Sequence, residues 1–248
     1  MTELNFQRQT GRPRISISAT RAAYIGPSLN LAPHRNVVAT LAFGLDGPFW
    51  LKVSGLSGEP ALIGETRFAL IPPGRLHHLK ATGWVGFVYL DPCGDDHRVI
   101  LQNGLDDLDA PLATIGAIDF MHWSVDEICA LIGLPQRPPA DVRIAATLRS
   151  IDLDPSAFSG ISTAAKVAQL SVSRFQSLLR ETTGVPFRRY RLWRRMVLVM
   201  RSLSEGQSLT NAALDGGFSS SAHLSSTFRA MFGIAPSTLA GVQIEFAP

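Results

Sequence analysis

The spacing of hydrophobic residues changes along the chain. Within residues 15–90 they alternate with polar residues or form short runs, as in W-V-G-F-V-Y-L at 84–90. Turns rich in Gly, Pro and Asp separate these runs, for example at Pro72-Pro73-Gly74. Short strands at such intervals are typical of all-β folds. This part of the chain is therefore predicted to form a small β-sandwich or barrel.

After residue 95 the apolar residues follow the period of helices. Ser124, with acidic residues two and three positions later, has the composition of a helix start and precedes Ile128–Leu134. Pro135–Pro139 has the composition of a linker, and helical spacing then continues to near the C-terminus. The chain is predicted to be an α+β multidomain protein, with a β-domain at 1–95, a helical linker at 96–139 and an all-α domain at 140–248.

Part of the helical half is repeated. Residues 161–171 read I-S-T-A-A-K-V-A-Q-L-S and residues 209–219 read L-T-N-A-A-L-D-G-G-F-S. Each copy runs into a second segment with apolar residues at helical spacing. A short helix, a tight turn and a second helix form a helix-turn-helix, which places its second helix in a DNA major groove. Two copies predict contact with two grooves.

The second segment of each copy presents a polar face opposite its apolar one. The polar residues are Ser173, Arg174, Gln176, Ser177 and Arg180 in the first copy and Ser221, Ala222, His223, Ser225, Ser226 and Arg229 in the second. Glutamine can bond bidentately to adenine and arginine to guanine, whereas serine reads bases weakly. A solvated helix surface is an equally good explanation for any single residue, but the duplication favours DNA recognition.

A long helix is predicted at Pro186–Leu203, between the two copies. Its apolar residues keep helical spacing, and six of its other positions are arginines: Arg188, Arg189, Arg191, Arg194, Arg195 and Arg201. Arginines on a helix often only form a solvent-exposed polar surface, but no acidic residue lies between Glu181 and Glu205. This charge favours phosphate contacts for some of them, with Arg188 and Arg195 as candidates.

Composition and charge support this division of the chain. The net charge is +3, but residues 140–248 hold twelve Lys and Arg against seven Asp and Glu, as expected of a half that contacts DNA. Cys93 and Cys129 have no metal-ligand spacing and are predicted to be free thiols. Because the sequence has no signal peptide and no apolar run near eighteen residues, a cytoplasmic protein without a membrane span is expected.

Two segments, T-G-V-P-F-R-R-Y-R-L-W-R-R and L-T-N-A-A-L-D-G-G-F-S-S-S-A-H-L-S-S-T-F-R-A-M-F-G-I-A-P, resemble the C-terminal domain of the AraC/XylS family of bacterial transcription regulators. The resemblance covers about residues 141–239. It implies two helix-turn-helix units joined by a long helix, a double-stranded DNA operator, and RNA polymerase as a partner. The base-facing residues that it implies are Ser173, Gln176, Ser177, Ser221, Ala222, Ser225 and Ser226. Gln169 departs from the family, which commonly has glycine there, and a left-handed glutamine would strain the first turn.

The N-terminal half resembles the cupin-like sensor domains that precede this module. Residues 72–77 fit the P-x-G-x-x-H pattern of the second cupin motif, whereas the first motif is partial, with His34 present and Asn36 in place of a second histidine. His34 and His77, with His78 as a third, are weak metal candidates, and histidines bonded inside a degenerate barrel are the preferred alternative. No cofactor is expected. His34, Trp50 and His77 are the candidates for binding a small-molecule effector.

The function predicted from these patterns is a sequence-specific DNA-binding transcription regulator, not an enzyme, under the control of an effector. The alternatives are a metal-dependent cupin enzyme with an accessory helical domain, and an architectural DNA-binding protein without an effector. Apolar residues within 119–134 predict a homodimer formed through this segment or the barrel. The alternative is that the segment packs on the barrel of its own chain. The residues concerned are Phe120, Trp123, Ile128, Leu131 and Ile132.

Overall fold

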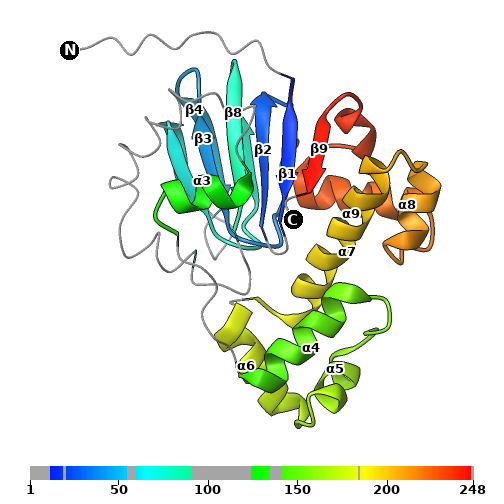
Figure 1. The fold of residues 1–248 in the computed structure, drawn as a ribbon. Helices are drawn as coiled ribbons and strands as arrows, with labels where there is room; N and C mark the ends of the chain where they lie inside the picture. Colours follow the sequence, from blue (N-terminus) through cyan, green and yellow to red (C-terminus); the bar gives the residue numbers. More distant parts are fainter. Residues whose placement is uncertain are drawn as a thin grey trace.

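The computed structural model describes residues 12–18, 21–54, 60–90, 96, 124–134, 141–183 and 185–246. A strand-rich N-terminal part is followed by helices that extend away from it (Figure 1). Cys93, Phe120 and Trp123, and the side chain of Leu131, lie outside the described residues. The predicted class, a small barrel or sandwich followed by a helical double helix-turn-helix, is confirmed.

Two sheets form the N-terminal part. The strands are β1 Arg14–Ile17, β2 Ala22–Pro27, β3 Thr40–Gly44, β4 Phe49–Ser54, β5 Pro60–Thr66, β6 Phe68–Ile71, β7 His77–Lys80 and β8 Trp84–Tyr89, with β9 Gln243–Phe246 from the end of the chain. One sheet has the order β6-β3-β8-β2-β1-β9 and the other β5-β4-β7.

Side-chain alternation explains how the sheets bury their cores. In β4, Phe49, Leu51 and Val53 are buried, while the intervening residues are half-buried or exposed. β3 is buried on both faces: Ala42 belongs to the core between the sheets, and Leu41 to the core under a helix on the outer face. The apolar runs of the sequence therefore mark strands with both faces covered.

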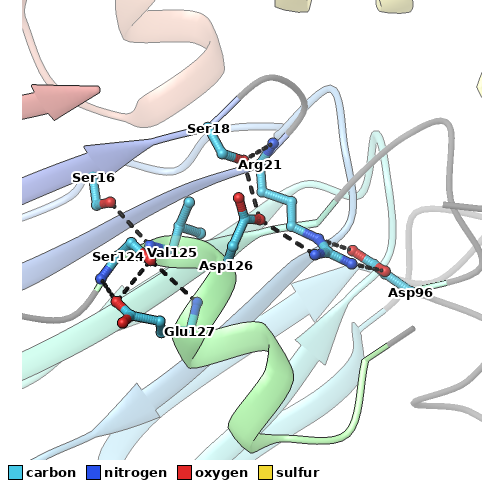
Figure 2. A network of polar contacts seen from close by, with 8 residues as sticks. All are labelled: Ser16, Ser18, Arg21, Asp96, Ser124, Val125, Asp126 and Glu127. Atoms are coloured by element: carbon cyan, nitrogen blue, oxygen red, sulfur yellow. Dashed lines mark hydrogen bonds and ion pairs between the residues drawn. The ribbon is translucent and has the colours of Figure 1, made fainter. Parts of the chain in front are cut away.

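The helix on the outer face is α3, Val125–Leu131. Ser124 and Glu127 form a reciprocal capping box, and the Val125 amide donates to the Ser16 hydroxyl at 2.9 Å (Figure 2). Ile128 and Ile132, two residues expected at a dimer interface, are buried against the sheet. This apolar face is thus used within the chain, in agreement with the alternative.

A buried ion pair also anchors this region. The Arg21 guanidinium donates to both carboxylate oxygens of Asp96, at 2.7 and 2.8 Å, and reaches Asp126 of α3 at 3.3 Å (Figure 2). Asp96 is fully buried. Despite burial, these carboxylates raise the pKa of Arg21, so the guanidinium stays charged and links α3 to the β1–β2 connection.

The helical part consists of two units joined by a long helix. The helices are α4 Val142–Leu153, α5 Ile161–Val167, α6 Val172–Thr183, α7 Phe187–Ser204, α8 Leu209–Asp215 and α9 Ser221–Phe232, followed by the short 3-10 helix η3 Pro236–Leu239. The first unit has its own core, which includes Ile144, Phe175 and Tyr190. The core of the second unit is continuous with that of the barrel.

Strand β9 strengthens the link between the second unit and the barrel. It pairs in parallel with β1 at the edge of the larger sheet (Figure 1), and Glu245 forms an ion pair with Arg14. The segment predicted as the DNA-binding domain thus contributes a strand to the N-terminal sheet. The pairing satisfies an otherwise open sheet edge.

Candidate nucleic-acid interface and effector cavity

The two helix-turn-helix units have matching turns. Gln169 has a φ of 55° and Gly217 a φ of 70°, so the left-handed conformation expected of Gln169 is confirmed. The Leu170 amide donates to the Ala165 carbonyl at 2.9 Å, and the Phe218 amide donates to the Ala213 carbonyl at 2.7 Å. The sequence repeat is therefore a repeat of backbone geometry.

The second helix of each unit begins at a serine cap. The Ser171 hydroxyl accepts from the Arg174 amide at 3.3 Å, and the Ser220 hydroxyl accepts from the His223 amide at 3.1 Å. In each helix the apolar side is buried, and Phe175 and Leu179 in α6 and Leu224 in α9 are fully buried.

The predicted base-facing residues lie on the outer sides of these helices. Those that are exposed are Ser173, Arg174, Ser177, Arg180, Ala222, Ser226 and Arg229, and those that are half-buried are Gln176, Ser221 and Ser225. A polar face free of the domain core is what a helix in a major groove requires. Their contacts with bases remain a prediction.

The arginines of α7 have several different neighbours. Arg194 pairs with Asp152 at 2.7 Å, Arg191 donates to the Pro155 carbonyl at 2.9 Å, and Arg201 stacks over the ring of Phe246. These contacts join α7 to α4, to the loop that follows α4 and to β9. Much of the predicted phosphate-facing cluster thus has a structural role.

Arg195 supports the second turn. It donates from Nε to the Gly216 carbonyl at 2.8 Å and from Nη2 to the Gly217 carbonyl at 2.6 Å, and its guanidinium lies 3.9 Å from the centre of the Phe218 ring. Burial, together with the charge of Arg191, lowers the pKa of Arg195.

Arg188 is exposed beside the same region. With Arg191, Arg195 and His223 it lines a groove of about 270 Å³ between α7 and α9. None of the described residues that line the groove carries a carboxylate. A DNA phosphate would be favoured there by charge.

An apolar cavity of about 70 Å³ lies behind α9, between the barrel and the helices. The sheet contributes Ile15, Ile17, Tyr24, Phe87 and Tyr89, and the helices contribute Trp193, Met196, Met200, Phe228 and Phe232. The ring of Phe232 lies 5.6 Å from that of Tyr89 and 4.6 Å from that of Phe228, measured between centres. Aromatic rings thus connect β8 to the inner side of α9.

Comparison with known proteins agrees with this arrangement. The helix-turn-helix domain family matches residues 164–241. This is an AraC-type domain. No curated protein matches the chain.

Solved structures of ToxT from Vibrio cholerae share the fold of the barrel and the AraC-type domain together. One has a TM-score of 0.53 at 11% sequence identity and covers 88% of this chain and 96% of ToxT. A second, with an unsaturated fatty acid bound, has a TM-score of 0.53 at 13% identity and covers 93% and 95%. With its AraC-type domain, the chain is a DNA-binding transcription regulator.

The histidines predicted for the effector or a metal lie together, next to the AraC-type domain. The rings of His34 and His77 are 4.1 Å apart between centres, and both residues are buried. Each Nδ1 donates to a backbone carbonyl, that of Ala32 at 2.8 Å and that of Arg75 at 3.0 Å. Within the described ranges no group of three or more His, Cys, Asp or Glu side chains could hold a metal ion.

Trp50 lies on β4, in the same three-stranded sheet as His77 on β7, in edge contact with His78 and under Lys80. None of the three predicted effector residues, His34, Trp50 and His77, lines the apolar cavity. Sequence reasoning missed the cavity because its two walls are far apart along the chain. One signal was present: Met231-Phe232 in the second copy stand where the first copy has Thr182-Thr183. This extra apolar pair indicates that the second unit packs against something that the first does not.

Proposed function

We propose that both units of the AraC-type domain bind one asymmetric operator and that a small molecule in the apolar cavity controls this binding. One observation carries the proposal: α9 has the predicted base-facing residues on its outer side and lines the cavity with its inner side. The same rigid helix therefore contacts both sites.

The contacts around α9 give a route from cavity to DNA. Phe228 and Phe232 are one helical turn apart and line the cavity together. A ligand between them and Tyr89 has to displace or press on these rings. Because packed rings resist compression, α9 would shift or tilt relative to α6. The size of the response is limited by the difference in ligand affinity between the two arrangements.

The ToxT comparison supports control by a mainly apolar small molecule. A protein of the same two-part fold has been solved with an unsaturated fatty acid bound. A largely apolar cavity behind a recognition helix is a suitable place for an apolar ligand in the present chain. Such a cavity is unnecessary in an architectural DNA-binding protein.

Several further features follow from the proposal. The protein acts on DNA in the cytoplasm, without catalysing a reaction, and RNA polymerase is its partner by family resemblance. None of the helices in the described ranges is long and apolar enough to cross a membrane. A homodimer would place two such sites on one operator, and sedimentation of the full chain on its DNA would count the chains.

The length of the operator tests whether both helix-turn-helix units bind DNA. Helix α7 has 18 residues and spans about 27 Å, and recognition helices beyond its ends can reach major grooves roughly 34 Å apart. DNA selected by the full chain from a random library should be protected over about two turns on one face. Inserting five base pairs between the half-sites should abolish tight binding, because it rotates one groove to the far side. Tight binding that survives the insertion would mean that only one unit reads DNA.

Variants of the recognition helices test the base-facing assignment. Gln176→Ala and Ser221→Arg should each change the preferred bases in their own half-site, by roughly 1 to 3 kcal/mol per contact. Ser162→Ala, at an exposed position on α5, which precedes the recognition helix α6, is the matched control and should leave the preference unchanged. An unaltered preference in both test variants would contradict the assignment.

A further inference from the structure

We propose that the cavity selects a neutral, mainly apolar effector that carries one hydrogen-bonding group, and that the Tyr89 hydroxyl bonds to this group. The inference rests on the proposed effector function and adds the chemical class of the ligand. In particular, it disfavours a carboxylate in the cavity.

The walls of the cavity have no ionic character. The lining residues are aliphatic, thioether or aromatic, and none of those described is lysine, arginine, histidine or an acid. An ionised carboxylate placed there would lose its hydration without gaining a cation. Such transfer is strongly unfavourable unless the charge is paired.

The arginines nearest to the cavity along α7 are engaged elsewhere. Arg194 and Arg195, which directly follow the lining residue Trp193, contact Asp152 and the second turn, respectively. Arg201, next to the lining residue Met200, stacks on Phe246. Recruiting any of them to an anionic ligand would break a contact that joins two elements.

Tyr89 provides the polar group. In β8, Val85, Phe87 and Tyr89 alternate onto the inner side of the sheet, which places the Tyr89 ring between Trp193 and Phe232. Its hydroxyl has no hydrogen-bond partner among the described residues. The other tyrosine of the cavity, Tyr24, already donates to the Pro27 carbonyl at 2.7 Å.

The state of the Tyr89 hydroxyl agrees with a neutral ligand. Burial raises the pKa of Tyr89, so the phenol remains protonated at neutral pH and can both donate and accept. A hydroxyl, amide or ketone on the ligand would satisfy it. Tyr89 is half-buried, so a ligand without a polar group would cover its hydroxyl and leave it unpaired.

The test compares ligands with the same six-carbon chain and different charge. Hexanamide, hexanoate and hexylammonium are each titrated into the full-length protein at pH 7.5 by calorimetry, as probes short enough for a cavity of about 70 Å³. Hexanamide should bind saturably, and the two ions at least tenfold more weakly. Tyr89→Phe removes only the hydroxyl and should weaken hexanamide about fivefold, since a hydrogen bond of ordinary strength is lost.

Ala22→Leu fills the cavity from β2 and should abolish hexanamide binding, which places the ligand in this cavity. If hexanoate binds as well as or better than hexanamide and Ala22→Leu abolishes both, the cavity is an effector site but the neutral class is wrong. Unchanged hexanamide affinity in folded Tyr89→Phe would overturn the role of the hydroxyl. If none of the three probes binds, both the ligand class and the effector role of the cavity are overturned, while operator binding by the full chain still tests the DNA-binding function separately.

Discussion

The Ala32 amide donates a hydrogen bond of 2.9 Å to the Gly233 carbonyl and thereby joins the barrel to the C-terminal end of α9. The Arg35 amide makes a second such bond, of 3.1 Å, to the Ala230 carbonyl. Carbonyls in the last turn of a helix have no partner within the helix, and here the barrel supplies it. The C-terminal end of α9 is therefore capped by the barrel.

Gly233→Ala should disturb this junction. Gly233 has a φ of 76°, and a Cβ atom there would lie 2.6 Å from the Ala32 carbonyl oxygen and 2.7 Å from Nδ1 of His34. Backbone strain and the clash together should lower the free energy of unfolding by about 2–3 kcal/mol, measured by urea denaturation. Gly241→Ala is the control: its φ is 83° but the space around it is open, so only about 1 kcal/mol should be lost. Equal losses would show that the junction tolerates a methyl group.

Gln169→Gly should stabilise the first helix-turn-helix unit. Gln169 has a left-handed backbone, which is unfavourable for a residue with a Cβ atom and normal for glycine. The expected gain is about 1 kcal/mol in thermal or urea unfolding. Gln207→Gly, an exposed glutamine without a positive φ, should give no gain. A loss of stability in Gln169→Gly would mean that its side chain contributes more than the strain.

Arg195→Ala should affect stability as well as DNA binding. Two hydrogen bonds to the turn and the contact with the Phe218 ring are lost, so the free energy of unfolding should fall by about 1–3 kcal/mol. Arg195→Lys should restore little, because an ammonium cannot reproduce the fork of the guanidinium.

Arg188→Ala is the matched comparison. Arg188 is exposed, so the free energy of unfolding should be unchanged. The affinity for DNA should fall similarly for all operators, and the slope of log affinity against log salt concentration should decrease in magnitude by about one. Normal stability in Arg195→Ala would contradict the supporting role of that side chain.

The buried histidine pair should make stability fall in weak acid. Burial, and then the neighbouring His34, lower the pKa of His77 from 6.5 to about 4. Between pH 6.5 and about 4 the unfolded chain binds a proton at His77 that the folded chain does not bind. The free energy of unfolding is therefore highest above pH 6.5 and falls as the pH is lowered towards 4. The total loss from this group is about 3 kcal/mol.

Urea unfolding at several pH values measures this effect. His77→Asn keeps a donor for the Arg75 carbonyl but does not titrate, so its stability should depend less on pH between 6.5 and 4 than that of the parent protein. His223→Asn, at an exposed position, should reproduce the parent profile. An identical slope in all three proteins would rule out a destabilising His77 proton.

The sequence alone determined the features that depend on near neighbours. Alternation predicted the strands, Ser124 predicted the start of α3, and the repeat predicted both helix-turn-helix units and the strained Gln169. These signals are local because helix caps, turns and periodic faces are set by residues within a few positions of one another. The polar outer faces of α6 and α9 were predictable for the same reason.

Only the tertiary structure decided how the two halves meet. The pairing of β1 with β9 and the cavity between Tyr89 and Phe232 join segments that are far apart in sequence. The arginines of α7 show the same limit: their spacing indicated charge, but the fold decided that Arg195 supports a turn while Arg188 is exposed. Periodicity shows which face of a helix is polar, but the partner of each side chain depends on long-range packing, which no local pattern encodes.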